Sequence, residues 1–199
     1  MPHGCMLCRI RLSSLKGARG SGADLSTYFY QLMEAPGSVP RRAFGRRITG
    51  GDAAALGLDS TKFWRLALLV LAMGGRNSAA IAQEVHEEVL RRGEAVFESE
   101  VLRYGLALPS GDLFIGAYLN DLGVVYICGL AIIHSDHGPD PDRTNKAHAS
   151  YEKHGLPVAL DKGFGFARRA AQPGGQDVAG ASAPAPSADT EFTLRGTRM

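Results

Sequence analysis

The sequence lacks the features of disulfide-rich and membrane-spanning proteins. Only three cysteines occur in 199 residues, too few and too unevenly placed for a disulfide framework, so we expect reduced thiols. The longest apolar run, residues 63–73, is interrupted by Arg65 and is shorter than the roughly 20 residues of a membrane-spanning helix. The first residues also lack the apolar stretch of a signal peptide. We therefore expect an intracellular protein with no membrane partner, in the cytoplasm or the nucleus.

Charge is distributed unevenly along the chain. The formal net charge is +2, but residues 1–50 hold eight basic and two acidic residues and so carry +6, which leaves −4 for the rest. A basic segment can bind nucleic-acid phosphates, because binding releases the counterions around them. The alternative is a solvated basic tail and loop.

Composition divides the chain into four parts. The overall content of 45% hydrophobic and 21% charged residues is ordinary for a globular protein. Residues 168–190 contain 15 Ala, Gly, Pro or Ser among 23 and predict a flexible linker. Residues 191–199 regain the alternating apolar pattern of a short strand. We predict a basic tail over residues 1–18, one domain over 19–167, the linker, and this terminal strand.

Two segments of the domain have helical patterns. Residues 77–96 space their apolar side chains at helical intervals behind an N-cap candidate, Asn77 or Ser78. Residues 144–155 predict a second helix that Gly155 closes. Before it, residues 134–145 contain two prolines and several aspartates, so we predict a loop there.

A hairpin is predicted between these helices. Two β-rich runs, residues 113–119 and 123–127, flank the turn-forming pair Asn120-Asp121. The order of strands and helices predicts an α+β fold in which helices pack on one face of an antiparallel sheet, rather than a doubly wound fold.

The predicted hairpin carries the sequence YLND, from Tyr118 to Asp121. A tyrosine, one apolar residue and an acidic pair between apolar runs is how metal-dependent nucleic-acid polymerases present their catalytic carboxylates. In this chain the first member of the pair is Asn120. The motif therefore leaves three alternatives: the chain is a polymerase, it is an impaired polymerase, or it is an unrelated protein in which these residues form an ordinary β-turn.

Further segments, in the same order, make the chain resemble the palm domain of reverse transcriptases from retroelements. Each segment alone is unspecific, and their succession carries the resemblance. Ala72 stands where the family has a proline, and the linker before the last segment is unusually long. The segments similar to the family's motifs are DLSTYFYQL at 24–32, LAMGGRNSAAIAQ at 71–83, YLND at 118–121, GLPVALDKGFGF at 155–166, and FTLRG, similar to the primer grip, at 192–196.

The resemblance implies a palm-like sheet and template-directed DNA synthesis by two-metal nucleotidyl transfer. Its partners would be an RNA or DNA template with primer and a deoxynucleoside triphosphate, and its cofactor Mg²⁺ or Mn²⁺. Mg²⁺ prefers hard oxygen ligands, and the implied ligands are the carboxylates of Asp24 and Asp121 and the backbone carbonyl of Leu25. Asn120 would complete the catalytic pair. Judged without the family, Asp24 is a helix N-cap and Asp121 a turn residue.

Substrate contacts are also implied by the resemblance. Phe29 occupies the place of a bulky side chain that excludes a ribose 2′-hydroxyl, and core packing is its alternative. Gly74 and Gln83 would lie beside the incoming nucleotide and the template, although Gly74 also suits a bare turn. Tyr118 belongs to the same substrate site through its motif. Lys162 matches a lysine that donates a proton to pyrophosphate, and a solvated surface lysine is the alternative.

Two departures from the family pattern bear on activity. Asn120 is neutral where the family has a charged metal ligand, and losing one preorganised electrostatic group costs roughly 10²- to 10³-fold in rate. Only 23 residues precede Asp24, where the family places fingers that grip the triphosphate and template. We therefore expect weak or absent polymerase activity. The alternative is a non-enzymatic nucleic-acid-binding remnant or a small α+β domain of another role.

Overall fold

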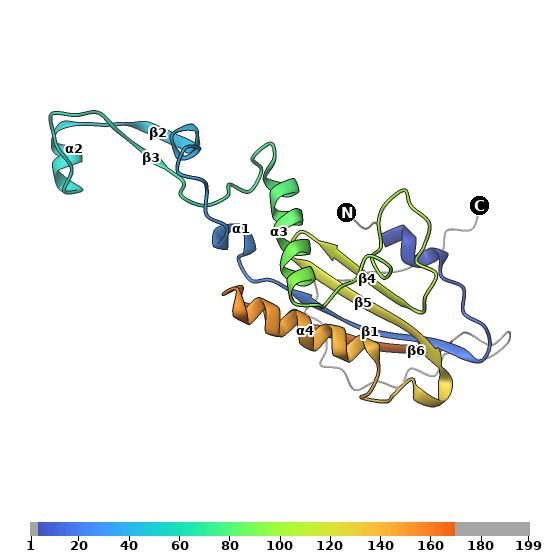
Figure 1. Ribbon diagram of the computed structural model, residues 1–199. Coiled ribbons are helices and arrows are strands. Elements are labelled where there is room, and N and C mark those ends of the chain that lie inside the picture. The colour runs from blue at the N-terminus through green and yellow to red at the C-terminus, as the bar shows by residue number, and fades with distance from the viewer. Residues whose placement is uncertain (1–3, 170–199) are drawn as a thin grey trace. The chain divides into compact units, whose positions relative to one another are not determined.

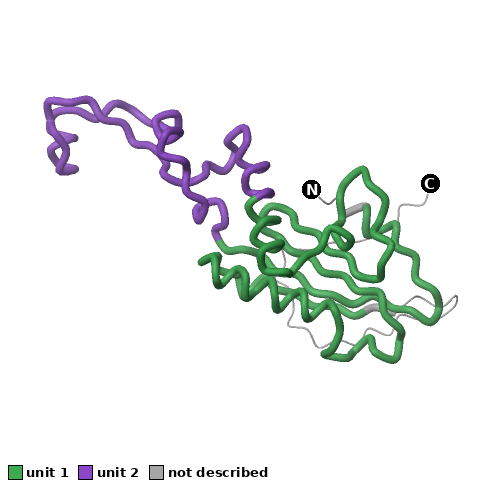
Figure 2. Tube along the Cα trace, viewed as in Figure 1, with its two compact units in different colours: residues 1–26, 85–199 green, residues 27–84 purple. Residues whose placement is uncertain are grey.

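The computed structural model describes residues 4–169, which form two compact units (Figure 1). Unit 1 is the described part of residues 1–26 and 85–199, and unit 2 is residues 27–84 (Figure 2). Each unit is treated by itself below. The linker beyond residue 169 and the terminal strand predicted over residues 191–199 lie outside the described residues.

Unit 1 is built on a four-stranded antiparallel sheet, which confirms the predicted α+β class. The strand order is β4-β5-β1-β6, so the hairpin of β4 and β5 lies beside the first strand of the chain. The strands are β1 (Lys16–Asp24), β4 (Leu113–Tyr118), β5 (Asp121–Gly129) and β6 (Phe164–Arg169); the helices are α3 (Ser78–Arg92), whose first residues belong to unit 2, and α4 (Pro139–Lys153), with 3₁₀ turns η1 (Gly4–Arg9) and η3 (Leu130–Ile132).

The helices of unit 1 cover one face of this sheet, as predicted. Side chains alternate between faces along a strand, and α4 lies along β1 and β5 in Figure 1, where Ser21 Oγ is 2.8 Å from Thr144 Oγ1. Leu90 of α3 lines the same small cavity as Ile115, whose face of the sheet therefore points to the helices. Ser150 of α4 donates a 2.7 Å hydrogen bond to the Val89 carbonyl, which joins the two helices.

Within the described residues, an apolar cluster covers one end of the opposite face of the sheet. Phe114 and Ile127 point to this face and form an apolar cluster with Met6 and Leu102. Leu12 packs at its edge. Residues 6–12, assigned from sequence to a basic tail, therefore contribute to the core, because their apolar side chains cover strands that would otherwise be exposed.

Helix α4 begins earlier than predicted, which corrects the loop predicted over residues 134–145. Pro139 is the first helical residue and Asp140 follows it. Proline is tolerated in the first turn because the N–H it lacks has no helical partner there, and aspartate favours a helix N-terminus. The predicted end is confirmed: Gly155 has φ +68°, and the Leu156 N–H donates to the Tyr151 carbonyl at 2.9 Å, as in a Schellman motif.

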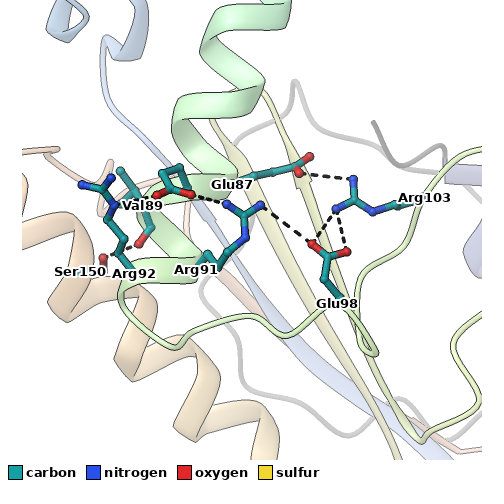
Figure 3. Close-up of polar contacts among 8 residues, drawn as sticks. Glu87, Val89, Arg91, Arg92, Glu98, Arg103 and Ser150 are labelled. Atoms are coloured by element: carbon teal, nitrogen blue, oxygen red, sulfur yellow. Dashed lines mark hydrogen bonds and ion pairs between the residues drawn. The ribbon is translucent and has the colours of Figure 1, made fainter.

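Ion pairs attach the segment after α3 to the helix itself (Figure 3). Arg103 contacts Glu98 at 2.9 Å and Glu87 of α3 at 3.4 Å. Arg91 is paired with Glu88 within the helix and lies 3.9 Å from Glu98. These contacts hold residues 98–103 against the helix. The Leu102 N–H donates to the Ile115 carbonyl at 2.8 Å and the Ile115 N–H donates to the Glu100 carbonyl at 2.8 Å, and these backbone hydrogen bonds place Leu102 in the apolar cluster.

Unit 2 consists of short elements around a two-stranded antiparallel sheet. Tyr28 is buried, and its hydroxyl donates a 2.8 Å hydrogen bond to the Ala82 carbonyl. The Leu71 N–H donates to the Leu32 carbonyl at 2.7 Å, which joins the two ends of the unit. The elements are α1 (Tyr28–Gln31), η2 (Val39–Arg42), β2 (Ala43–Ile48), α2 (Gly50–Ala55) and β3 (Trp64–Ala67).

Within the described residues, every helix is too short or too polar to cross a bilayer.

Candidate functional site

Two aspartates lie opposite each other where β1 ends and β5 begins. The register pairs Asp24 with Asp121, and Tyr118 of β4 with Asp121. Residues directly opposite on antiparallel strands have Cβ atoms about 4.5–5.5 Å apart. Asp24 is not the N-cap of α1, since Thr27 holds that position. Asp121 is the first residue of β5 rather than part of the turn.

This carboxylate pair lies on the face of the sheet that the helices leave uncovered. Ser21 contacts α4, and Asp24, three residues later on the same strand, points to the other face. Tyr118 shares that face and is partly exposed. The apolar cluster of Phe114 covers the far end of this face. At the near end Asp121 is exposed and Asp24 is buried.

A row of glycines adjoins the carboxylates on this face. Gly22, Gly123 and Gly116 lie opposite one another on three neighbouring strands, two residues from Asp24 and Asp121. A Cβ at Gly22 would lie 2.3 Å from the Phe164 ring, so a larger residue there would have to displace that ring. A Cβ at Gly123 would meet its nearest described neighbour only at 3.9 Å. The Phe164 ring therefore lies over Gly22, whereas Gly123 leaves bare backbone beside the acidic pair, where another molecule can approach closely.

Both carboxylate oxygens of Asp24 have partners from other segments. The side-chain amide of Asn120 donates a hydrogen bond to Oδ1. The Lys162 ammonium forms an ion pair with Oδ2 at 2.8 Å, although 63% of the lysine side chain is exposed. Lys162 is therefore at the candidate site rather than on an unrelated surface. Asn120 acts here as a donor to Asp24.

The charges of these groups influence one another. Partial burial raises the pKa of the Asp121 carboxyl, and the negative charge of Asp24 raises it further, while Lys162 lowers it. The hydrogen bond to Asp24 raises the pKa of Lys162, and the charge of Asp24 adds to this. Two carboxylates and one ammonium leave a net charge of about −1 when all are ionised. The site is suited to attract a cation.

Leu25 is held by the hairpin turn that follows β4. Its N–H donates a 2.9 Å hydrogen bond to the Asn120 carbonyl, and it forms an antiparallel bridge with Val158. Leu25 is thus adjacent to the carboxylates and buried. The structure brings together Asp24, Leu25, Tyr118, Asn120, Asp121 and Lys162 among the residues predicted from sequence.

The donor set fits one hard cation better than two. Asp24 and Asp121 offer carboxylate oxygens from neighbouring strands, as Mg²⁺ and Mn²⁺ prefer. Among the described residues no group of three Asp, Glu, His or Cys side chains is placed to hold a metal. Asn120 could add its amide oxygen only by rotating away from its hydrogen bond to Asp24.

Three other predicted substrate residues belong to unit 2. Phe29 is buried beside Tyr28, with ring centroids 6.2 Å apart, as its core-packing alternative requires. Gly74 has φ +88°, which suits a bare turn. Gln83 is buried in α3. The candidate site is therefore formed by residues of unit 1 alone.

The basic residues of the first fifty are only partly available to phosphates. Lys16, Arg19, Arg42 and Arg46 are already paired with carboxylates. Arg19 is buried with Asp140 and is structural. The exposed members are Arg9, Arg11, Arg41, Arg46 and Arg47.

One polar residue at the hairpin was missed in the sequence. His86 of α3 is fully buried, with Nδ1 2.6 Å from the Leu119 carbonyl oxygen and Nε2 2.7 Å from the Tyr151 hydroxyl. Burial lowers its pKa from 6.5 to about 4. The available signal was its position four residues after Ala82 and three before Val89, on the apolar face of the helix.

Compared with models of known protein families and with curated proteins, the chain has no match.

Proposed function

We propose that the chain is a reverse-transcriptase-like palm domain that binds one divalent cation and a nucleic-acid strand at Asp24 and Asp121, with little or no polymerase activity. The observation that carries the proposal is the pairing of Asp24 with Asp121 across adjacent antiparallel strands, at positions where the motif order calls for metal ligands. When bound, Mg²⁺ or Mn²⁺ would activate a hydroxyl and hold phosphate oxygens.

Access to Asp121 supports a polymeric ligand. Asp121 is exposed at this end of the sheet, beside the backbone of Gly123, while its partner Asp24 is buried. Phe164 is exposed on the neighbouring edge strand, and exposed aromatic rings are common stacking platforms for bases. A strand of nucleic acid could therefore lie across the sheet next to the acidic pair.

The same residues argue for weak catalysis. Asn120 supplies no charge, and its amide is engaged with Asp24. Lys162 neutralises part of that carboxylate, so a cation must compete with an internal ion pair. Positioning of the reacting groups can contribute about 7–11 kcal/mol to lowering a barrier, and one Asn120→Asp change does not supply that positioning.

Mn²⁺ and Mg²⁺ titration calorimetry, with primer extension on the same samples, tests the proposal. The wild type should bind Mn²⁺ weakly, Asp121→Asn should lose this binding, and Asn120→Asp should tighten it at least about tenfold, as restoring one ligand implies. Asp112→Asn is the matched control, because Asp112 is an exposed carboxylate of the same unit paired with Lys16.

Two results would overturn parts of the proposal. Equal Mn²⁺ affinity in wild type and Asp121→Asn would exclude the cation site. Robust primer extension by the wild type would show that Asn120 suffices for catalysis. Melting of each variant with and without Mn²⁺ adds a readout independent of activity, because a ligand that binds the folded state raises its stability.

A non-enzymatic nucleic-acid-binding role is the second candidate, favoured by the exposure of Arg9, Arg11 and Arg47. Phosphate contacts of this kind are independent of sequence and weaken as salt rises. Titration of a labelled primer-template at two salt concentrations measures this. Affinity that does not change with salt would contradict it.

A further inference from the structure

The turn between β4 and β5 contains a residue in an unfavourable conformation. Leu119 has φ +52°, in the left-handed region that leucine rarely adopts. Two-residue hairpin turns of this kind favour glycine or asparagine at such positions. The turn joins Tyr118 to Asp121 and so determines where the Asn120 and Asp121 side chains lie. Contacts from outside the turn must favour this conformation.

His86 and Tyr151 supply those contacts. The Leu119 carbonyl can only accept, so the 2.6 Å contact requires that His86 Nδ1 carry the hydrogen. The neutral ring then accepts the Tyr151 hydroxyl hydrogen at Nε2, at 2.7 Å. Both side chains are almost fully buried, where unpaired polar atoms are costly. A chain of hydrogen bonds thus runs from α4 through α3 to the turn.

We propose that His86 is a positioning residue that, together with Tyr151, holds the Leu119 and Asn120 turn and thereby places Asn120 and Asp121 beside Asp24. The peptide group is planar, so fixing the Leu119 carbonyl also fixes the direction of the Asn120 N–H. Beyond this peptide, the Asn120 carbonyl accepts the Leu25 N–H at 2.9 Å and the Asn120 amide reaches Asp24.

Two conservative variants separate this role from simple core filling. In His86→Asn, the shorter amide can still donate from near the Nδ1 position. In His86→Gln, the longer amide places its polar atoms near Nε2, toward Tyr151, and the donor to Leu119 is lost. Both remove the ring and leave a similar gap. A role in packing alone predicts that both behave alike.

Amide hydrogen exchange reports the turn directly. The Leu25 N–H bonds to the Asn120 carbonyl, whereas the Ile127 N–H bonds to the Asp112 carbonyl at 2.7 Å, at the other end of the sheet, and serves as internal control. His86→Gln should accelerate Leu25 exchange about 5- to 30-fold relative to Ile127, since releasing a left-handed residue is worth roughly that factor. His86→Asn should change this ratio by less than about threefold.

A rescue and a metal readout complete the experiment. Leu119→Gly removes the conformational penalty, so adding it to His86→Gln should return the exchange ratio to within about threefold of wild type. The second readout is Mn²⁺ affinity, and it alone rests on the proposed function. This affinity should fall about tenfold in His86→Gln and recover in the double variant.

The outcomes are distinguishable. Equal acceleration at Leu25 and Ile127, or equal effects of the Asn and Gln variants, would overturn the role of His86. Absence of Mn²⁺ binding in all variants would reject the proposed function, while the exchange ratio would still decide the role of His86. If His86→Gln does not fold, His86→Leu replaces it: this side chain fills a similar volume, lacks the donor to the Leu119 carbonyl, and should raise the Leu25 exchange rate relative to that of Ile127. An unchanged ratio would count against the proposal.

Discussion

The interaction of Arg19 with Asp140 is expected to be the most sensitive polar contact of unit 1. Arg19 Nη2 lies 2.9 Å from Asp140 Oδ1, and the side chains are only 6% and 10% exposed. The guanidinium also donates to the carbonyls of Ile132 at 2.8 Å and His137 at 2.6 Å. Removing one partner of a buried ion pair leaves an uncompensated charge and typically costs 3–5 kcal/mol.

Asp140→Ala should therefore lower the free energy of unfolding by about 3–5 kcal/mol. Arg19 would keep its carbonyl acceptors, so its charge stays buried without the carboxylate. Urea denaturation followed by circular dichroism measures the change, provided that the slope with denaturant is unchanged. A loss of this size is a large part of the stability of an ordinary domain.

Asp112→Ala is the matched control for this prediction. Asp112 pairs at 2.9 Å with Lys16, which lies on the same strand as Arg19. The side chains of Lys16 and Asp112 are 43% and 54% exposed, and such pairs contribute at most about 1 kcal/mol. The double variant Arg19→Met with Asp140→Leu should recover part of the loss, because no charge is left buried. Equal destabilisation by Asp140→Ala and Asp112→Ala would refute the reasoning.

Three further predictions concern single residues. Acidification from pH 7 to pH 5 should lower the free energy of unfolding by about 2 kcal/mol. The cause is His86, whose pKa is about 4 when folded and 6.5 when unfolded, so the unfolded state takes up the proton first. Urea denaturation at both pH values should show this loss in the wild type and not in His86→Asn. Gly155→Ala should cost about 1 kcal/mol in thermal melting because φ is +68°, whereas Gly129→Ala, where a Cβ meets no described atom within 4 Å, should cost less. Lys162→Met should raise the pKa of Asp121 further, since Lys162 lowers it; a carboxyl carbon-13 titration that showed no rise would contradict the assigned interaction.

Local patterns were sufficient to predict the elements that form the site. The hairpin around Asn120 and Asp121 and the helix beginning near Ser78 depend on side-chain periodicity within one segment, and both are confirmed. The start of α4 was missed because proline was taken to exclude helix, although Pro139 stands at the first position where it is tolerated. The sequence did not indicate the division at residues 27–84, because compactness depends on contacts between distant segments.

The candidate site shows the same limit. The adjacency of Asp24 and Asp121 was expected from a family resemblance, and the register shows them opposite each other. The resemblance placed Asn120 beside Asp24, but the individual hydrogen bonds were not predictable: His86 bonds to Leu119 from 33 residues away, and the Asn120 amide donates to Asp24 from 96 residues away. Hydrogen bonds across such separations are produced by the packing of whole elements, and no local pattern records them.

Asn120 and Lys162 together change what the site requires in order to be stable. Three carboxylates at this point would repel one another and would need a cation for neutralisation. With asparagine at position 120, Asp24 instead accepts an amide N–H on one oxygen and an ammonium on the other, so the charge is largely compensated within the chain. The fold can therefore persist without a metal. The binding free energy of a cation at Asp24 and Asp121 therefore comes only from the remaining net negative charge, reduced by the cost of displacing Lys162. Asn120 and Lys162 thus account for both the weak cation binding and the weak catalysis that we expect.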